Sequence, residues 1–178
     1  MTPDIGMRLG TIARALQQVV IPALPADQVL AIEQATLCLG HLGIIGEQLN
    51  YVADYDATCL ADMTDLAEQL VTASAGGPRT QAATEALRDL LTRAGASPHG
   101  MAATAKDQRN ALAAAIDALV RASGLDAETD FLAASQRLVL GHGARQSFRD
   151  RAWFKGCGLD PDRAALPSIP QLLLEGGQ

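Results

Sequence analysis

The chain has few cysteines, and they follow no recognised pattern. Cys38, Cys59 and Cys157 are the only three among 178 residues, and none belongs to a CxxC pair or a Cys/His cluster of the zinc type. Three thiols cannot all pair within one chain, so a disulfide framework is not expected. We therefore expect a reducing compartment, the cytoplasm.

Long apolar runs are also missing. The early apolar run at residues 19–24 covers six residues and contains Pro22, which does not fit a secretion signal. The later stretch at 35–46 has twelve residues and contains His41, whereas a membrane-spanning helix needs about 20 residues. The sequence predicts neither a secretion signal nor a membrane span.

Basic residues are scarce at one end of the chain. The net charge of −6 disfavours nucleic-acid binding, which depends on Lys and Arg neutralising phosphates. Residues 1–75 hold nine acids and two arginines, a net charge of −7, whereas residues 137–163 hold six bases and three acids, a net charge of +3. The basic segment either docks against the acidic half, in the same chain or across a dimer, or forms an anion site.

Aromatic residues make up only 3% of a chain that is 48% apolar, so the core is expected to consist of Leu, Ala, Val and Ile. Abundant Ala and Leu favour helices over sheets. Apolar spacing of three and four predicts five helical segments. They cover about residues 9–20, 26–73, 79–93, 98–122 and 126–156.

Terminal residues support these boundaries. Pro22 and Pro25 end the first segment, and Gly76-Gly77-Pro78 ends the second. Ser97 before Pro98 is expected to cap the fourth segment, and Asp126 the fifth.

The second segment has the most regular apolar seam of the chain, with Asp56 as its one charged member. The seam positions are Ala35, Cys38, Leu42, Ile45, Leu49, Val52, Asp56, Cys59, Met63, Leu66 and Leu70. A continuous helix over residues 26–73 would be about 70 Å long, which exceeds a compact domain of this size. Either one long helix shared with a second subunit or two coaxial helices broken near residues 50–56 would satisfy the pattern. The long apolar surface makes a homodimer the default expectation.

The predicted fold is all-α: an antiparallel helical bundle of four to five helices with an extended Pro-containing C-terminal strap. Residues 1–158 form the bundle domain. Residues 159–178 form the strap, which packs on the same domain and has one helical turn near residues 171–175.

Catalytic motifs for nucleotide binding, acyl transfer or metalloproteolysis are absent. Gly40, Gly43 and Gly46 have no phosphate-loop spacing and instead suit the close approach of another helix, a kink or a ligand. Cys38 and His41 lie one helical turn apart, but two ligands do not make a metal site. His99 and His142 complete no ligand set, so neither a metal nor a cofactor is expected.

One polar stripe is a candidate ligand site. His142, Arg145 and Arg149 share a face of the fifth segment, and Trp153 lies one turn further on. Guanidinium groups beside an indole plane could hold a carboxylate or a phosphate. Alternatively, Asp56 or another acid of the second segment neutralises the stripe as a buried polar partner.

The sequence thus predicts a non-catalytic helical assembly or accessory protein that acts through protein–protein contacts. It is expected to form a homodimer, and another protein is a candidate partner. The alternatives are a small anionic-ligand binder or enzyme that uses His142, Arg145 and Arg149, and a metal-binding helical bundle.

Overall fold

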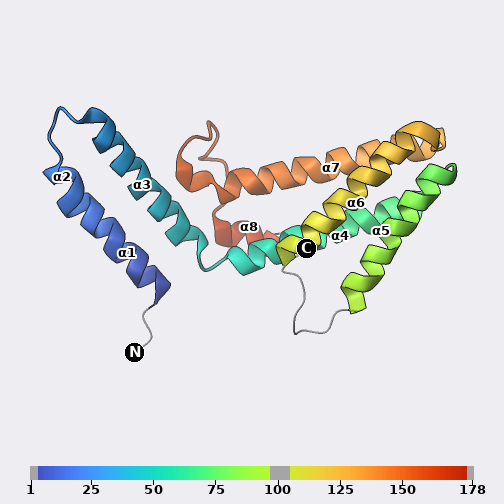
Figure 1. Ribbon diagram of the computed structural model, residues 1–178, viewed down its shortest axis with the longest axis horizontal. Helices are drawn as coiled ribbons and strands as arrows, with labels where there is room; N and C mark the ends of the chain where they lie inside the picture. Colours follow the sequence, from blue (N-terminus) through green and yellow to red (C-terminus); the bar gives the residue numbers. More distant parts are fainter. Residues whose placement is uncertain (1–3, 97–104, 176–178) are drawn as a thin grey trace. The chain divides into compact units, whose positions relative to one another are not determined.

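The computed structural model describes residues 4–96 and 105–175, and every regular element within these ranges is a helix (Figure 1). The all-α prediction is therefore confirmed. The elements are α1 (Ile5–Ala15), the π-helical η1 (Leu16–Val20), α2 (Ile21–Ala23), α3 (Val29–Gln48), α4 (Val52–Ala73), α5 (Pro78–Ala96), α6 (Ala105–Asp126), α7 (Thr129–Trp153), the 3-10 helix η2 (Lys155–Cys157) and α8 (Ile169–Glu175).

The described residues hold seven helices rather than four or five, counting α1, η1 and α2 as one continuous helix. The second predicted segment is broken at residues 49–51 into α3 and α4, so it is not one continuous helix. The C-terminal segment contains α8, a seven-residue helix where a single turn was expected. The expected start of the fourth segment, with Ser97, Pro98 and His99, lies outside the described residues.

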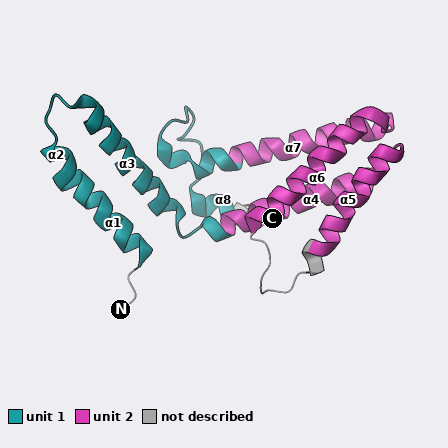
Figure 2. Ribbon diagram, viewed as in Figure 1, with its two compact units in different colours: residues 1–53, 149–178 teal, residues 54–148 magenta. Residues whose placement is uncertain are grey.

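Contacts within the chain divide it into two compact units, shown in Figure 2. Unit 1 consists of residues 1–53 and 149–178, and unit 2 of residues 54–148. Both boundaries fall within helices, near the start of α4 and near the end of α7, whereas the sequence patterns suggested a division at residue 158.

Unit 2 is built around one hydrophobic core to which four helices contribute. Leu70 of α4, Leu87 of α5 and Leu119 of α6 are fully buried, and Phe131 of α7 is nearly so. Leu112 and Ile116 of α6 join the same core, as their spacing predicted. Aliphatic side chains at three- and four-residue spacing thus account for the packing of this unit.

The corners α4–α5 and α6–α7 are joined by backbone contacts. Gly77 N donates to Asp126 O at 2.8 Å, and Glu128 N donates to Ala75 O at 3.0 Å. A Cβ atom at Gly76 would lie 2.7 Å from the Ala127 Cα, and one at Gly77 would lie 2.7 Å from Asp126 Oδ2. Glycine is therefore required at position 76 by close approach to backbone, and Gly77 leaves room for the Asp126 carboxylate.

Asp126 caps a different helix from the one expected. It is the last residue of α6, and its carboxylate accepts hydrogen bonds from Arg79 N at 2.8 Å and from Thr80 N at 3.0 Å at the start of α5. The prediction that Asp126 caps the fifth segment is therefore wrong. The corner contact brings it to a helix start 47 residues away, whose free N–H groups it satisfies.

In unit 1, the helix formed by α1, η1 and α2 packs against α3 as a helical hairpin (Figure 1). No residue of these four elements is buried. The small core of this unit lies elsewhere, where Ala152 at the end of α7 packs against Leu166 and Leu172 of the C-terminal segment.

Candidate functional site

The structure does not gather the predicted stripe on α7 into one site. His142 and Arg149 are buried, whereas Arg145 is exposed. Trp153 is buried at the end of the helix, 8% exposed. His142 and Arg145 belong to unit 2, while Arg149 and Trp153 belong to unit 1. The four residues share a helix, but only Trp153 lines a pocket that the structure shows.

Asp56, the expected partner of that stripe, is half-buried on α4 and faces another helix of unit 2. Its carboxylate lies 3.8 Å from the guanidinium of Arg109 on α6. Arg109 lies outside the basic C-terminal segment, so the charge pattern of the sequence did not predict this pair.

Within residues 4–96 and 105–175, no group of three His, Cys, Asp or Glu side chains is arranged to hold a metal ion. Cys38 and His41 are both exposed on α3, and Cys59 is buried in α4. The described residues thus supply no third ligand to the pair on α3.

Unit 1 contains a pocket of about 560 Å³, which we call the C-terminal pocket. This volume lies within the range of small-molecule sites, roughly 300–1,000 Å³. Its walls come from the end of α3 and the turn after it, the end of α7, η2, the segment before α8 and the start of α8. The residues that define it chemically are Glu47, Tyr51, Trp153, Lys155, Arg163 and Ile169.

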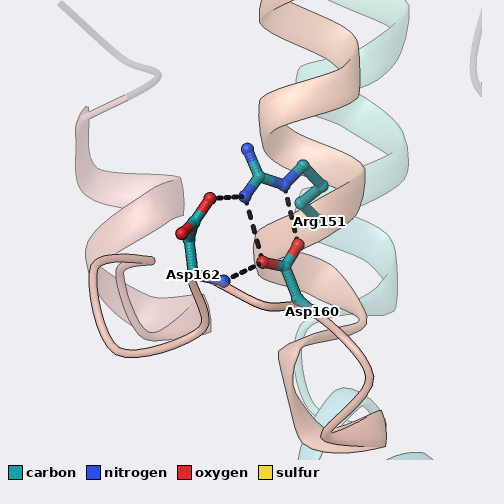
Figure 3. Close-up of polar contacts among 3 residues, drawn as sticks. All are labelled: Arg151, Asp160 and Asp162. Carbon is teal, nitrogen blue, oxygen red and sulfur yellow. Dashed lines mark hydrogen bonds and ion pairs between the residues drawn. The ribbon is translucent and has the colours of Figure 1, made fainter.

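An arginine clamp fixes the loop that carries Arg163 (Figure 3). Arg151 Nε and Nη2 donate to the two carboxylate oxygens of Asp160 at 2.7 and 3.0 Å, and Nη2 also reaches Asp162 at 3.3 Å. Asp162 N donates to Asp160 Oδ1 at 2.9 Å, which closes a tight turn around Pro161. A bidentate pair of this kind fixes direction as well as distance, so the backbone before Arg163 is held in place.

The same contacts shift the ionisation of the clamp. The hydrogen bonds from Arg151 lower the pKa of Asp160 below its usual value, and the bond from the Asp162 backbone adds to the effect. Hydrogen bonding to Asp160 raises the pKa of Arg151 in turn. Both groups therefore stay charged across the physiological range.

Two further contacts attach the pocket walls to one another. Gln48 at the end of α3 donates from Nε2 to the carbonyl of Trp153 at 2.9 Å. Lys155 Nζ donates to the carbonyl of Leu166. Gly156 allows a close approach, because a Cβ atom there would lie 2.7 Å from Glu47 Oε2. Gly158, with φ of 72°, then reverses the chain.

Sequence reasoning identified Trp153 but missed Lys155 and Arg163 as its cationic neighbours. These residues follow the end of α7, where helical spacing no longer predicts which side chains meet. The left-handed glycine and the Asp160-Pro161-Asp162 turn were the available signals that the chain folds back. They indicated a turn without indicating what it faces.

The second feature of unit 1 is the apolar exterior of its helical hairpin. Large apolar side chains on it are exposed over much of their surface, including Val19 at 65%, Leu30 at 69% and Leu37 at 56%. A Cβ atom at Gly40, Gly43 or Gly46 would meet nothing within 4 Å, so the helix that these glycines were expected to admit is not supplied by the described residues.

Helix α3 is longer than the apolar stretch identified in the sequence. Its 20 residues are long and apolar enough to cross a membrane, by length and composition alone. None of the qualifying stretch is buried within the structure. The described residues therefore leave the apolar exterior of α3 uncovered.

Comparison of the chain with protein-family models, with curated proteins and with solved structures gives no match. The C-terminal pocket and the apolar exterior of the hairpin are thus the features of unit 1 that bear on function.

Proposed function

We propose that the protein is a non-catalytic assembly protein that forms a homodimer through the helical hairpin of α1 and α3. The observation that supports this proposal is the absence of any buried residue in these helices, although both carry large apolar side chains. A helix that is apolar on most sides is stable in water only when another surface covers it.

The available area is sufficient for a dimer. Two helices about 10 Å wide and about 30 Å long present a face of roughly 600 Å². Two copies would then bury about 1,200 Å² together, the lower end of stable protein interfaces. Glycines at 40, 43 and 46 would let the two α3 helices approach closely, since they carry no side chain.

A second copy fits this face better than a lipid bilayer does. The helix that packs beside α3 carries Arg8 and Arg14, both exposed, and Glu33 is exposed on α3 itself. Charged side chains are costly within a bilayer but tolerable at the rim of a protein interface. An apolar patch without a strong charge pattern also suits a symmetric contact, in which the same surface meets itself. On this proposal the protein is a cytoplasmic dimer.

Leu37→Glu tests the proposal, because Leu37 is 56% exposed and lies on a helix with no buried residue, so the replacement leaves the buried cores intact. We expect the variant to be monomeric by light scattering after size exclusion and to keep its helix content by circular dichroism, since a carboxylate would be buried without a partner in the dimer. Leu140→Glu on α7 is the matched control, because Leu140 is 73% exposed in unit 2.

A dimer that persists in Leu37→Glu, or that is lost only in Leu140→Glu, would show that the hairpin is not the interface. If the wild-type protein sediments as a monomer but binds vesicles of phosphatidylcholine, the apolar face binds a membrane instead of a second copy.

A further inference from the structure

The C-terminal pocket has the shape and chemistry of a binding site, independently of how the hairpin associates. It combines an indole ring and a phenol with apolar Ile169 and Ala152, and two cationic side chains share the same hollow. Ligand sites commonly have this composition: mostly apolar walls with a few polar groups that fix orientation.

The charges in the pocket favour an anion. Lys155 and Arg163 stand against one acid, Glu47, among the lining residues. Within the described part of the chain, Arg163 forms no ion pair, so its guanidinium is available to a ligand. Lys155 donates to a neutral carbonyl, which positions its ammonium group without cancelling the charge.

We propose that the C-terminal pocket binds a small monocarboxylate with an aromatic or branched apolar body. The carboxylate would be held by Arg163, with Lys155 adding positive potential, and the body would lie against Trp153 and Tyr51. Guanidinium groups bind carboxylates through two parallel hydrogen bonds, and aromatic faces bury apolar groups at low entropic cost.

The loop geometry makes this site preorganised. The Arg151 clamp on Asp160 and Asp162 fixes the turn before Arg163, and the bond of Lys155 to Leu166 fixes the segment after it. Binding then requires ordering of one exposed arginine side chain rather than of a whole loop, which limits the entropic cost.

The fluorescence of Trp153 can report ligand binding directly, because Trp153 is the only tryptophan of the chain and lines the pocket. The probe is 3-phenylpropanoate, titrated into the full-length protein while Trp153 emission is recorded. Its neutral and cationic analogues, 3-phenylpropanamide and 3-phenylpropan-1-amine, have the same apolar body. We expect a saturable change in emission with the carboxylate, and weaker binding of both analogues.

Two exposed positions give opposite expected effects without touching the core. Arg163→Gln should weaken 3-phenylpropanoate binding about tenfold, the usual effect of losing one charge-assisted pair. Glu47→Gln should tighten binding a few-fold, since it removes the one repulsive charge. Arg93→Gln on α5 is the control, because Arg93 is exposed in unit 2 and should leave the affinity unchanged.

Three results would overturn the proposal: no saturable change in Trp153 emission at millimolar probe, tighter binding of the amine than of the carboxylate, or an affinity that Arg163→Gln leaves intact. Leu37→Glu is expected to bind 3-phenylpropanoate normally. The proposed dimer and the proposed binding site can therefore be contradicted independently of each other.

Discussion

At the scale of single residues, a glycine without a side chain allows the close backbone contact at the corner of unit 2. Gly76 has no positive φ, so its role is not conformational. The Ala127 Cα occupies the space that a Cβ atom at Gly76 would need, and the backbone bonds of Gly77 and Glu128 require that approach. A side chain at position 76 should therefore disturb the α4–α5 and α6–α7 corners together.

Gly76→Ala is expected to destabilise unit 2 by about 1–3 kcal/mol, the usual cost of overpacking. The measurement is urea unfolding followed by circular dichroism. Gly124→Ala is the matched control, because a Cβ atom there meets nothing within 4 Å and alanine is the better helix former by about 1 kcal/mol. Equal stability of the two variants would contradict the close approach seen at the corner.

At the scale of elements, the Arg151 clamp makes a prediction about pH. The folded protein lowers the pKa of Asp160, chiefly through hydrogen bonds from Arg151. A carboxyl group of this kind stabilises the fold above its ordinary value of 3.8, and the contribution is lost as the pH falls through the lower folded value. The loop at residues 159–163 should therefore be held in place at neutral pH and become looser in acid, once Asp160 is protonated.

Arg151→Gln should produce the same loosening at pH 7, because Asp160 loses its bidentate partner. Hydrogen exchange of peptides that cover residues 159–166 is expected to become faster, with little change elsewhere. Arg121→Gln is the control, since Arg121 makes a comparable bidentate contact with Asp117 inside α6. Unchanged exchange in Arg151→Gln would mean that the clamp does not hold the loop.

The elements also show what periodicity can predict. Cys59, Leu66 and Leu70 of the apolar seam are buried in α4 as their spacing predicted, whereas Cys38 and Ile45, on the same seam, are exposed on α3. Spacing shows which residues share a face, but it does not show whether a partner covers that face.

Contacts between distant segments could not be predicted from the sequence either, because local patterns do not show which segments meet. The capping of α5 by Asp126 and the meeting of Arg163 with Trp153 in one pocket depend on turns that bring these residues together. Local patterns located the turns but not their partners.

At the scale of the whole molecule, the two units differ in how they use apolar residues. Unit 2 buries leucines from α4, α5 and α6 and Phe131 from α7 in its own core, whereas the hairpin of unit 1 leaves large side chains exposed. The first arrangement gives unit 2 a core of its own, and the second leaves an apolar surface of the kind that partners cover. This contrast is the basis of the homodimer that we propose.

The most direct test of this account is the mass of the wild-type protein by sedimentation velocity across a range of concentrations. The account predicts a species of twice the 18.6 kDa chain mass that dissociates only on dilution. A single species of 18.6 kDa at every concentration would contradict it.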